Sequence, residues 1–141
     1  MATGLHPDFE VVGPDGDVRL VAEVKGSSHG VEQARQQVSR YAVVSNAPWA
    51  MVATPESVQL FRFAIDGGLE PVDSMPTSRL VAHYGRENDR KLYFESYVRT
   101  ILELWLRDLT VQWKSANTPA PSLGPGDFEA AVRTGTLLVE P

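Results

Sequence analysis

Two β-strand patterns separated by a tight turn lie near the start of this chain. The first covers Asp8–Val12 and the second covers Arg19–Lys25, in which Leu20, Ala22 and Val24 alternate with the residues between them. The intervening Pro14–Asp17 segment reads Pro-Asp-Gly-Asp, with proline and glycine at positions that a β-turn favours. The pattern predicts a β-hairpin, which places the start of the first strand beside the end of the second.

Strand and helix patterns alternate over the next part of the chain. Apolar residues recur at three- and four-residue spacing over Val31–Ser45, which predicts a helix. Trp49–Thr54 predicts a buried strand, and Val58–Phe63 predicts an edge or half-exposed strand. Asp66–Arg86 holds three glycines and two prolines and predicts mainly loop, although Leu69–Val72 could pair as a short strand.

The C-terminal part is dominated by a long helix, predicted over Asp89–Lys114 with Asn88 as its N-cap. Its apolar stripe is wider than one packed face needs, which suggests contact with more than the domain's own sheet. After a Pro/Gly/Ser-rich segment, a short helix over Asp127–Arg133 and an apolar strand or arm over Thr136–Val139 are predicted.

These elements predict an α/β fold with a small mixed sheet flanked by helices. Residues 1–114 are expected to form the main domain, residues 115–126 a linker, and residues 127–141 a C-terminal short helix and arm. A length of 141 residues with 43% hydrophobic and 22% charged content suits one globular domain. The chain has no cysteine, which excludes disulfides and thiolate metal ligands.

Composition also bears on partners and location. No apolar run approaches the ~20 residues of a membrane span, and the first residues lack a secretory signal pattern, so no membrane partner and a cytoplasmic location are expected. The net charge of −5 argues mildly against a nucleic-acid binder, which usually carries a basic surplus. Bound divalent cations, or a local basic face built from Lys25, Arg35 and Arg40, would offset this charge.

The hairpin carries the side chains with the clearest chemistry. Asp8 at the start of one strand and Glu23 at the end of its partner can share a divalent cation, and the Val24 carbonyl is the natural third ligand. The strand period places the side chains of Glu23 and Lys25 on one face. The ammonium of Lys25 would then stand near an attacking water, as hydrolysis of a phosphodiester requires.

The order Pro7-Asp8, then Glu23-Val24-Lys25, resembles the PD-(D/E)XK nuclease superfamily, whose fold is the restriction-endonuclease-like core. Gln37 and Tyr41 in the following helix match the Q-x-x-x-Y signature of its RecB-type branch. The later strand pair up to Phe63 is similar to that of this branch and of the N-terminal nuclease domains of type I restriction subunits. The likeness covers about residues 5–63.

The resemblance implies a Mg²⁺- or Mn²⁺-dependent nuclease acting on DNA in defence, restriction or repair. Asp8 and Glu23 would hold the metal and Lys25 would assist the water. Gln37 and Tyr41 would contact DNA or support the lysine, with Arg40 as a further nucleic-acid-binding candidate. The family normally begins with a helix, often bearing another metal-binding glutamate, and only six residues precede Pro7 here.

Two alternatives follow from that difference. The chain could be a catalytically silent relative that binds nucleic acid or a partner protein, which the acidic balance and the missing front element favour. It could also be an oligomerisation module in which the long helix and the C-terminal arm dock onto another copy. A second copy or another protein could then supply the missing element.

Overall fold

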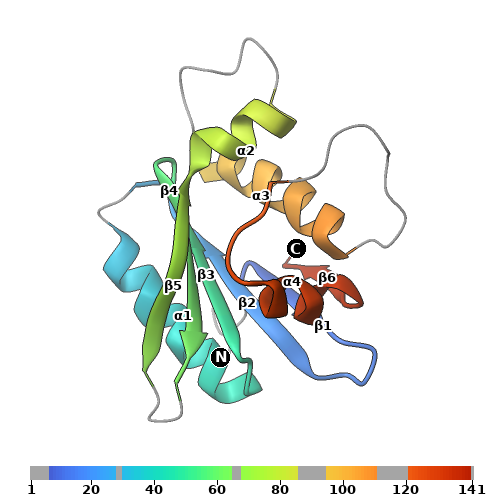
Figure 1. Ribbon diagram of the computed structural model, residues 1–141. Helices are drawn as coiled ribbons and strands as arrows, with labels where there is room; N and C mark the ends of the chain where they lie inside the picture. The colour runs from blue at the N-terminus through green and yellow to red at the C-terminus, as the bar shows by residue number, and fades with distance from the viewer. Residues whose placement is uncertain (1–6, 28–29, 65–67, 86–94, 111–120, 141) are drawn as a thin grey trace.

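The fold is a mixed sheet with helices on both faces, as predicted (Figure 1). The computed structural model describes residues 7–27, 30–64, 68–85, 95–110 and 121–140. The strands are β1 (Phe9–Val12), β2 (Val18–Val24), β3 (Trp49–Ala53), β4 (Ser57–Phe63), β5 (Leu69–Pro76) and β6 (Thr136–Val139). The helices are α1 (Val31–Ser45), α2 (Thr77–Tyr84), α3 (Glu95–Thr110) and α4 (Gly126–Arg133).

The strands are ordered β5-β4-β3-β2-β1-β6 in one sheet. Only the β2–β3 pair is parallel among these neighbours, and α1 connects its two strands, as parallel strands require. β1 and β2 form the predicted antiparallel hairpin. Its turn is closed by hydrogen bonds from the Gly13 N–H to the Asp17 carbonyl and from the Asp17 N–H to the Asp15 carboxylate.

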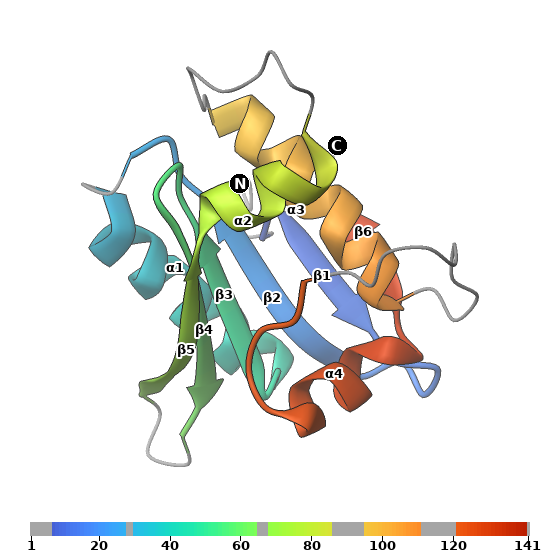
Figure 2. The same cartoon turned by 45° about the horizontal axis from the view of Figure 1, so that its top comes forward.

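The helices divide into two layers. Figure 2 shows α2, α3 and α4 in front of the sheet and α1 behind it. α1 packs Ala34, Val38 and Ala42 on the sheet face that includes Val21. On the other face, α2, α3 and α4 cover the alternate residues of β2, and Trp105 of α3 is fully buried there. β3 is buried along its whole length because helices cover both of its faces.

The structure corrects two predictions. β4 is an interior strand between β3 and β5, so the edge alternative is wrong, while its partly exposed residues fit the half-exposed alternative. The segment predicted mainly as loop contains the edge strand β5 and the helix α2. Proline is tolerated on an edge strand because its missing N–H can face solvent, so Pro71 does not break β5. α2 is held by tertiary contacts, including a 2.7 Å hydrogen bond from the Thr77 hydroxyl to the Thr54 carbonyl.

Over the described helix, Glu95–Thr110, the apolar stripe of α3 is covered within the chain. α3 contacts α2, α4, β6 and β2, which explains why its stripe is wider than one face needs. Asn88 and the ends of the predicted helix, residues 89–94 and 111–114, lie outside the described residues. Among those described, no helix is long and apolar enough to cross a membrane.

The C-terminal segment packs on the same sheet as the rest of the chain. Leu123 is buried, and the carbonyl of Pro121 accepts a 2.8 Å hydrogen bond from the Trp105 indole. α4 places Phe128 edge-on against Trp49, and the Arg62 side chain bonds Asp127 at 2.7 Å. β6 pairs antiparallel with β1, so the C-terminal strand supports the strand that follows Asp8.

Candidate active site

Asp8 and Glu23 lie opposite each other at one end of the β1–β2 hairpin. The strand pairs run Glu10 opposite Val21 and Phe9 opposite Ala22, so the next pair outward is Asp8 and Glu23. Glu23 Oε1 accepts a hydrogen bond from the Asp8 backbone N–H at 3.3 Å, and Asp8 Oδ2 accepts one from the Val24 N–H at 2.8 Å. These reciprocal contacts bring the two carboxylates together, as the sequence predicts.

Lys25 joins the two carboxylates from the same strand end. Its Nζ lies 3.9 Å from Oε2 of Glu23. The aliphatic part of its side chain passes Gly30 at the start of α1, where an added Cβ would lie 3.5 Å from the Lys25 Cβ and Cγ atoms. The ammonium is therefore held beside Glu23 by both the strand and the helix start.

The Val24 carbonyl points toward the side of β2 on which Asp8 lies. The Lys25 N–H donates to the Ala53 carbonyl of β3 at 2.9 Å. In a trans peptide the carbonyl and the N–H point in opposite directions, so the carbonyl of Val24 faces away from β3 and toward the β1 side. The predicted third oxygen ligand is thus oriented toward the carboxylate pair.

Glu23 has the most perturbed acid–base chemistry of this group. Burial, followed by the negative charge of Asp8, raises the pKa of Glu23 from 4.5 to about 7. The Asp8 N–H and the positive charges of Lys25 and Arg99 act in the opposite direction and do not cancel the rise. A carboxyl whose pKa is raised toward neutral pH by a second carboxylate is common in functional sites and in sites that bind cations.

Tyr41 of α1 faces this group, and Gln37 lies one turn before it. Burial and then the charges of Glu23 and Asp8 raise the pKa of the Tyr41 phenol, which therefore stays protonated at neutral pH. Oε1 of Gln37 is buried and, in the described part of the chain, has no hydrogen-bond partner. A buried acceptor without a partner is uncommon and marks a place for a donor.

The two predicted arginines are placed differently from Gln37 and Tyr41. Arg40 is exposed on α1. Arg35 lies over the Phe61 ring and donates to the Leu69 carbonyl at 3.1 Å, so it is engaged by β4 and β5. No described hydrogen bond or ion pair joins either arginine to the carboxylates, and their role in binding nucleic acid stays a prediction.

Arg99 of α3 is a member of the site that the sequence analysis missed. Its Nη1 lies 2.8 Å from Oδ1 of Asp8. The helical pattern gives only a weak signal for it, an arginine beside the apolar stripe of α3. Its position becomes evident only when α3 is packed over the end of the hairpin.

The donor set fits a hard divalent cation. Mg²⁺ and Mn²⁺ favour carboxylate and carbonyl oxygens, and Mg²⁺ keeps several of its waters, so two carboxylates and the Val24 carbonyl suffice. A cation between Asp8 and Glu23 would also relieve the repulsion that helps to raise the pKa of Glu23. No group of three or more His, Cys, Asp or Glu side chains suited to a metal occurs among the described residues.

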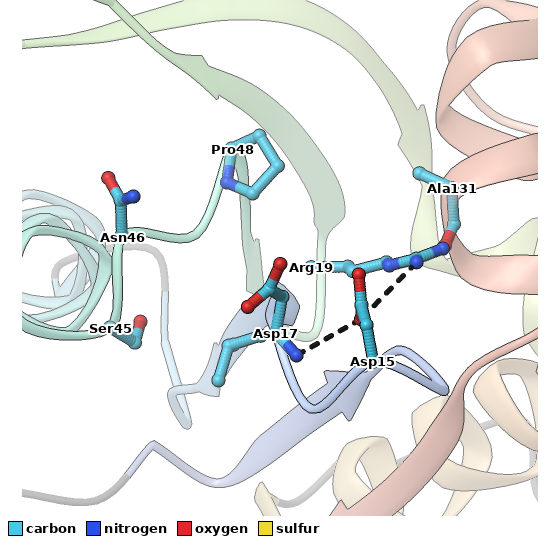
Figure 3. Close-up of a pocket in the computed structure, with 8 residues that line it drawn as sticks. Asp15, Asp17, Arg19, Ser45, Asn46, Pro48 and Ala131 are labelled. Atoms are coloured by element: carbon cyan, nitrogen blue, oxygen red, sulfur yellow. Dashed lines mark hydrogen bonds and ion pairs between the residues drawn. The ribbon is translucent and has the colours of Figure 1, made fainter.

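A surface pocket of about 350 Å³ lies at the opposite end of β2 (Figure 3). Its lining includes Asp15, Asp17 and Asn46. The Asp15 carboxylate accepts a hydrogen bond from the Asp17 N–H at 3.2 Å and forms an ion pair with Arg19 at 3.5 Å. Arg19 also donates to the Ala131 carbonyl at 3.0 Å. These contacts close the hairpin turn against α4, so the predicted turn role of this segment is confirmed.

No protein-family model, curated protein or solved structure matches this chain.

Proposed function

We propose that this chain hydrolyses phosphodiester bonds in DNA with the help of Mg²⁺ or Mn²⁺. The observation that supports the proposal most is the meeting of Asp8, Glu23 and Lys25 at one strand end, with the Val24 carbonyl oriented to the same side. Two hard carboxylates and one ammonium within a few ångströms are the groups that metal-assisted attack of water on phosphorus needs.

Each side chain has a distinct role in this proposal. Asp8 and Glu23 would hold the cation, and Lys25 would orient the attacking water and stabilise negative charge on the pentavalent phosphorus. The chemistry supplied by a bound cation is activation of water and neutralisation of the phosphate oxygens. Tyr41 lies close enough to Glu23 and Asp8 to feel their charges, and the buried acceptor of Gln37, one helical turn earlier, would receive a hydrogen bond from a water or a bound ligand.

One observation favours a second function, a catalytically silent module that binds nucleic acid or a protein. Both carboxylate oxygens of Asp8 have partners within the chain, Val24 N–H on one and Arg99 on the other. Such a carboxylate is already neutralised without a metal. The net charge of −5 also disfavours tight binding to DNA by the chain alone.

The test is incubation of the purified chain with plasmid and linear DNA in Mg²⁺ or Mn²⁺, with EDTA as the blank. We expect cleavage that Asp8→Asn, Glu23→Gln and Lys25→Ala each reduce by about 100-fold or more. Asp17→Asn is the matched control, because Asp17 is a hairpin carboxylate at the opposite end of β2.

Calorimetry with Mn²⁺ separates the two functions. Heat of binding that disappears in Asp8→Asn and Glu23→Gln supports the hydrolase. A folded wild-type chain that neither binds Mn²⁺ nor cuts DNA supports the silent module and rejects the hydrolase.

A further inference from the structure

Arg99 reaches the carboxylate pair from the helix layer opposite α1. Its guanidinium bonds Asp8 at 2.8 Å and lies over the Phe9 ring, 5.8 Å from the ring centre. The Arg99 side chain is 31% exposed and that of Asp8 is 14% exposed. The guanidinium is therefore partly exposed to solvent beside a carboxylate pair that is largely buried.

The helix that carries Arg99 is firmly seated. Its neighbours Val98 and Leu102 are buried in the main core, and the side chain of Glu95, one turn earlier, lies against Gly26 just after the Glu23–Lys25 segment. The Phe9 ring gives the guanidinium a second contact, since a cation within about 6 Å of a ring centre is attracted to its face. Arg99 can thus give up its ion pair with Asp8 and still remain beside the site.

The charges of the site point to an anionic ligand. With Asp8 and Glu23 ionised, and Lys25 and Arg99 protonated, the four side chains are neutral together. A divalent cation on the carboxylates leaves two positive charges in excess. A phosphodiester, with one negative charge, would offset part of that excess.

We propose that Arg99 is the phosphate-binding residue of this site and that its ion pair with Asp8 is the position it takes before metal and DNA bind. This inference rests on the proposed function. Once released from Asp8, which would then be free to hold a cation, the guanidinium would exchange one oxyanion for another and bind a non-bridging oxygen of the scissile phosphate. Arginine suits this exchange because its planar fork fits carboxylate and phosphate oxygens equally well.

The test compares Arg99→Gln and Arg99→Lys with Arg107→Gln, whose arginine lies on the same helix and pairs only with Glu103 among the described residues. Three measurements are made on the full chain: Mn²⁺ affinity by calorimetry, affinity for a short DNA duplex in non-catalytic Ca²⁺ over a series of salt concentrations, and cleavage in Mg²⁺. Thermal unfolding reports on folding.

We expect Arg99→Gln to bind Mn²⁺ about three- to tenfold more tightly, because a competing positive charge has left Asp8. Its DNA affinity should fall, and the slope of log affinity against log salt should decrease by about one. Cleavage should drop about 100-fold, with Arg99→Lys intermediate and Arg107→Gln unchanged.

Other results overturn the inference. If Arg99→Gln binds Mn²⁺ more weakly and also melts at lower temperature, Arg99 only supports the structure of Asp8. If its salt slope and cleavage equal those of the wild type, Arg99 does not touch the phosphate. A wild-type chain that binds Mn²⁺ and DNA without cutting rejects the hydrolase, while the salt slope still decides whether Arg99 binds phosphate.

Discussion

A buried carboxyl beside another carboxylate keeps its proton to higher pH than a carboxyl in water. Glu23 is 7% exposed and faces Asp8 across the strand pair. Its raised pKa means that the folded state holds a proton between pH 4.5 and about 7 that the unfolded chain has released. The same residue thereby links the stability of the fold to the chemistry of the site.

This linkage predicts the sign of a pH effect on stability. In the absence of metal, the contribution of Glu23 to the free energy of unfolding should be full below pH 4.5 and should be lost as pH rises through about 7. The loss is at most about 3–4 kcal/mol, because each pKa unit corresponds to about 1.4 kcal/mol. Glu23→Gln cannot ionise, so it should match the wild type near pH 4.5 and exceed its stability near pH 8.

Urea unfolding at pH 4.5, 6 and 8 measures the effect, with Glu32→Gln on the exposed side of α1 as the control. Parallel stability curves for Glu23→Gln and the wild type would show that Glu23 is not linked to folding. Saturating Mn²⁺ should flatten the wild-type curve, because a bound cation stabilises the ionised carboxylate.

The site residues that the sequence predicts lie near one another along the chain, whereas the one that it does not predict lies far from them. Asp8, Glu23 and Lys25 belong to one hairpin, so a turn and a period-two pattern are enough to bring them together. Arg99 reaches them only through the packing of α3 on the sheet. No local sequence pattern predicts that contact.

Helix α3 is the element that ties the front layer to the sheet. Its Trp105 is fully buried in the core, and the indole donates to the Pro121 carbonyl at 2.8 Å. The same hydrogen bond anchors the segment that leads into α4. Burial of this one side chain therefore supports α3, α4 and, through Arg99, the end of the hairpin.

We expect Trp105→Ala to lower the free energy of unfolding by about 3–5 kcal/mol, because it leaves a large cavity and an unpaired carbonyl. Trp105→Phe keeps much of the packing and should cost less. Leu104→Ala on the same helix is the control, since Leu104 is 42% exposed and should change stability by less than about 1 kcal/mol. Urea titrations measure the three values, and equal losses at the two positions would contradict this account of the core.

Clear boundaries explain which elements the sequence predicts well. α1 occupies Val31–Ser45 as predicted, because a glycine-serine break precedes it and Asn46 ends it with a left-handed backbone at φ 61°. Only the first half of β5 was predicted, as a possible short strand over Leu69–Val72, and α2 was missed, because prolines and a short helix give no sustained period. Their existence depends on pairing with β4 and on packing against α3.

At the scale of the whole molecule, the two ends of the described chain meet at the site. β6 lies at the sheet edge beside β1, and the Glu140 N–H donates to the Asp8 carbonyl at 3.0 Å. Without β6, the strand that follows Asp8 would itself be an edge with unpaired backbone groups. The C-terminal strand therefore fixes the backbone of a proposed metal ligand.

The ladder between β1 and β6 allows a sharp test of that support. Glu140 pairs through its N–H with Asp8, and hydrogen-bonded pairs alternate in an antiparallel ladder, so the Leu138 N–H faces Glu10. Leu138→Pro removes this donor, whereas Leu138→Thr keeps it and suits a strand. The Leu138 side chain is 48% exposed, so both variants lose little packing.

We expect Leu138→Pro to lose about 2–3 kcal/mol of stability and to weaken Mn²⁺ binding, with Leu138→Thr close to the wild type. Calorimetry and urea unfolding measure both effects, and undiminished Mn²⁺ affinity in a folded Leu138→Pro variant would show that Asp8 is positioned by β2 and Arg99 without help from β6.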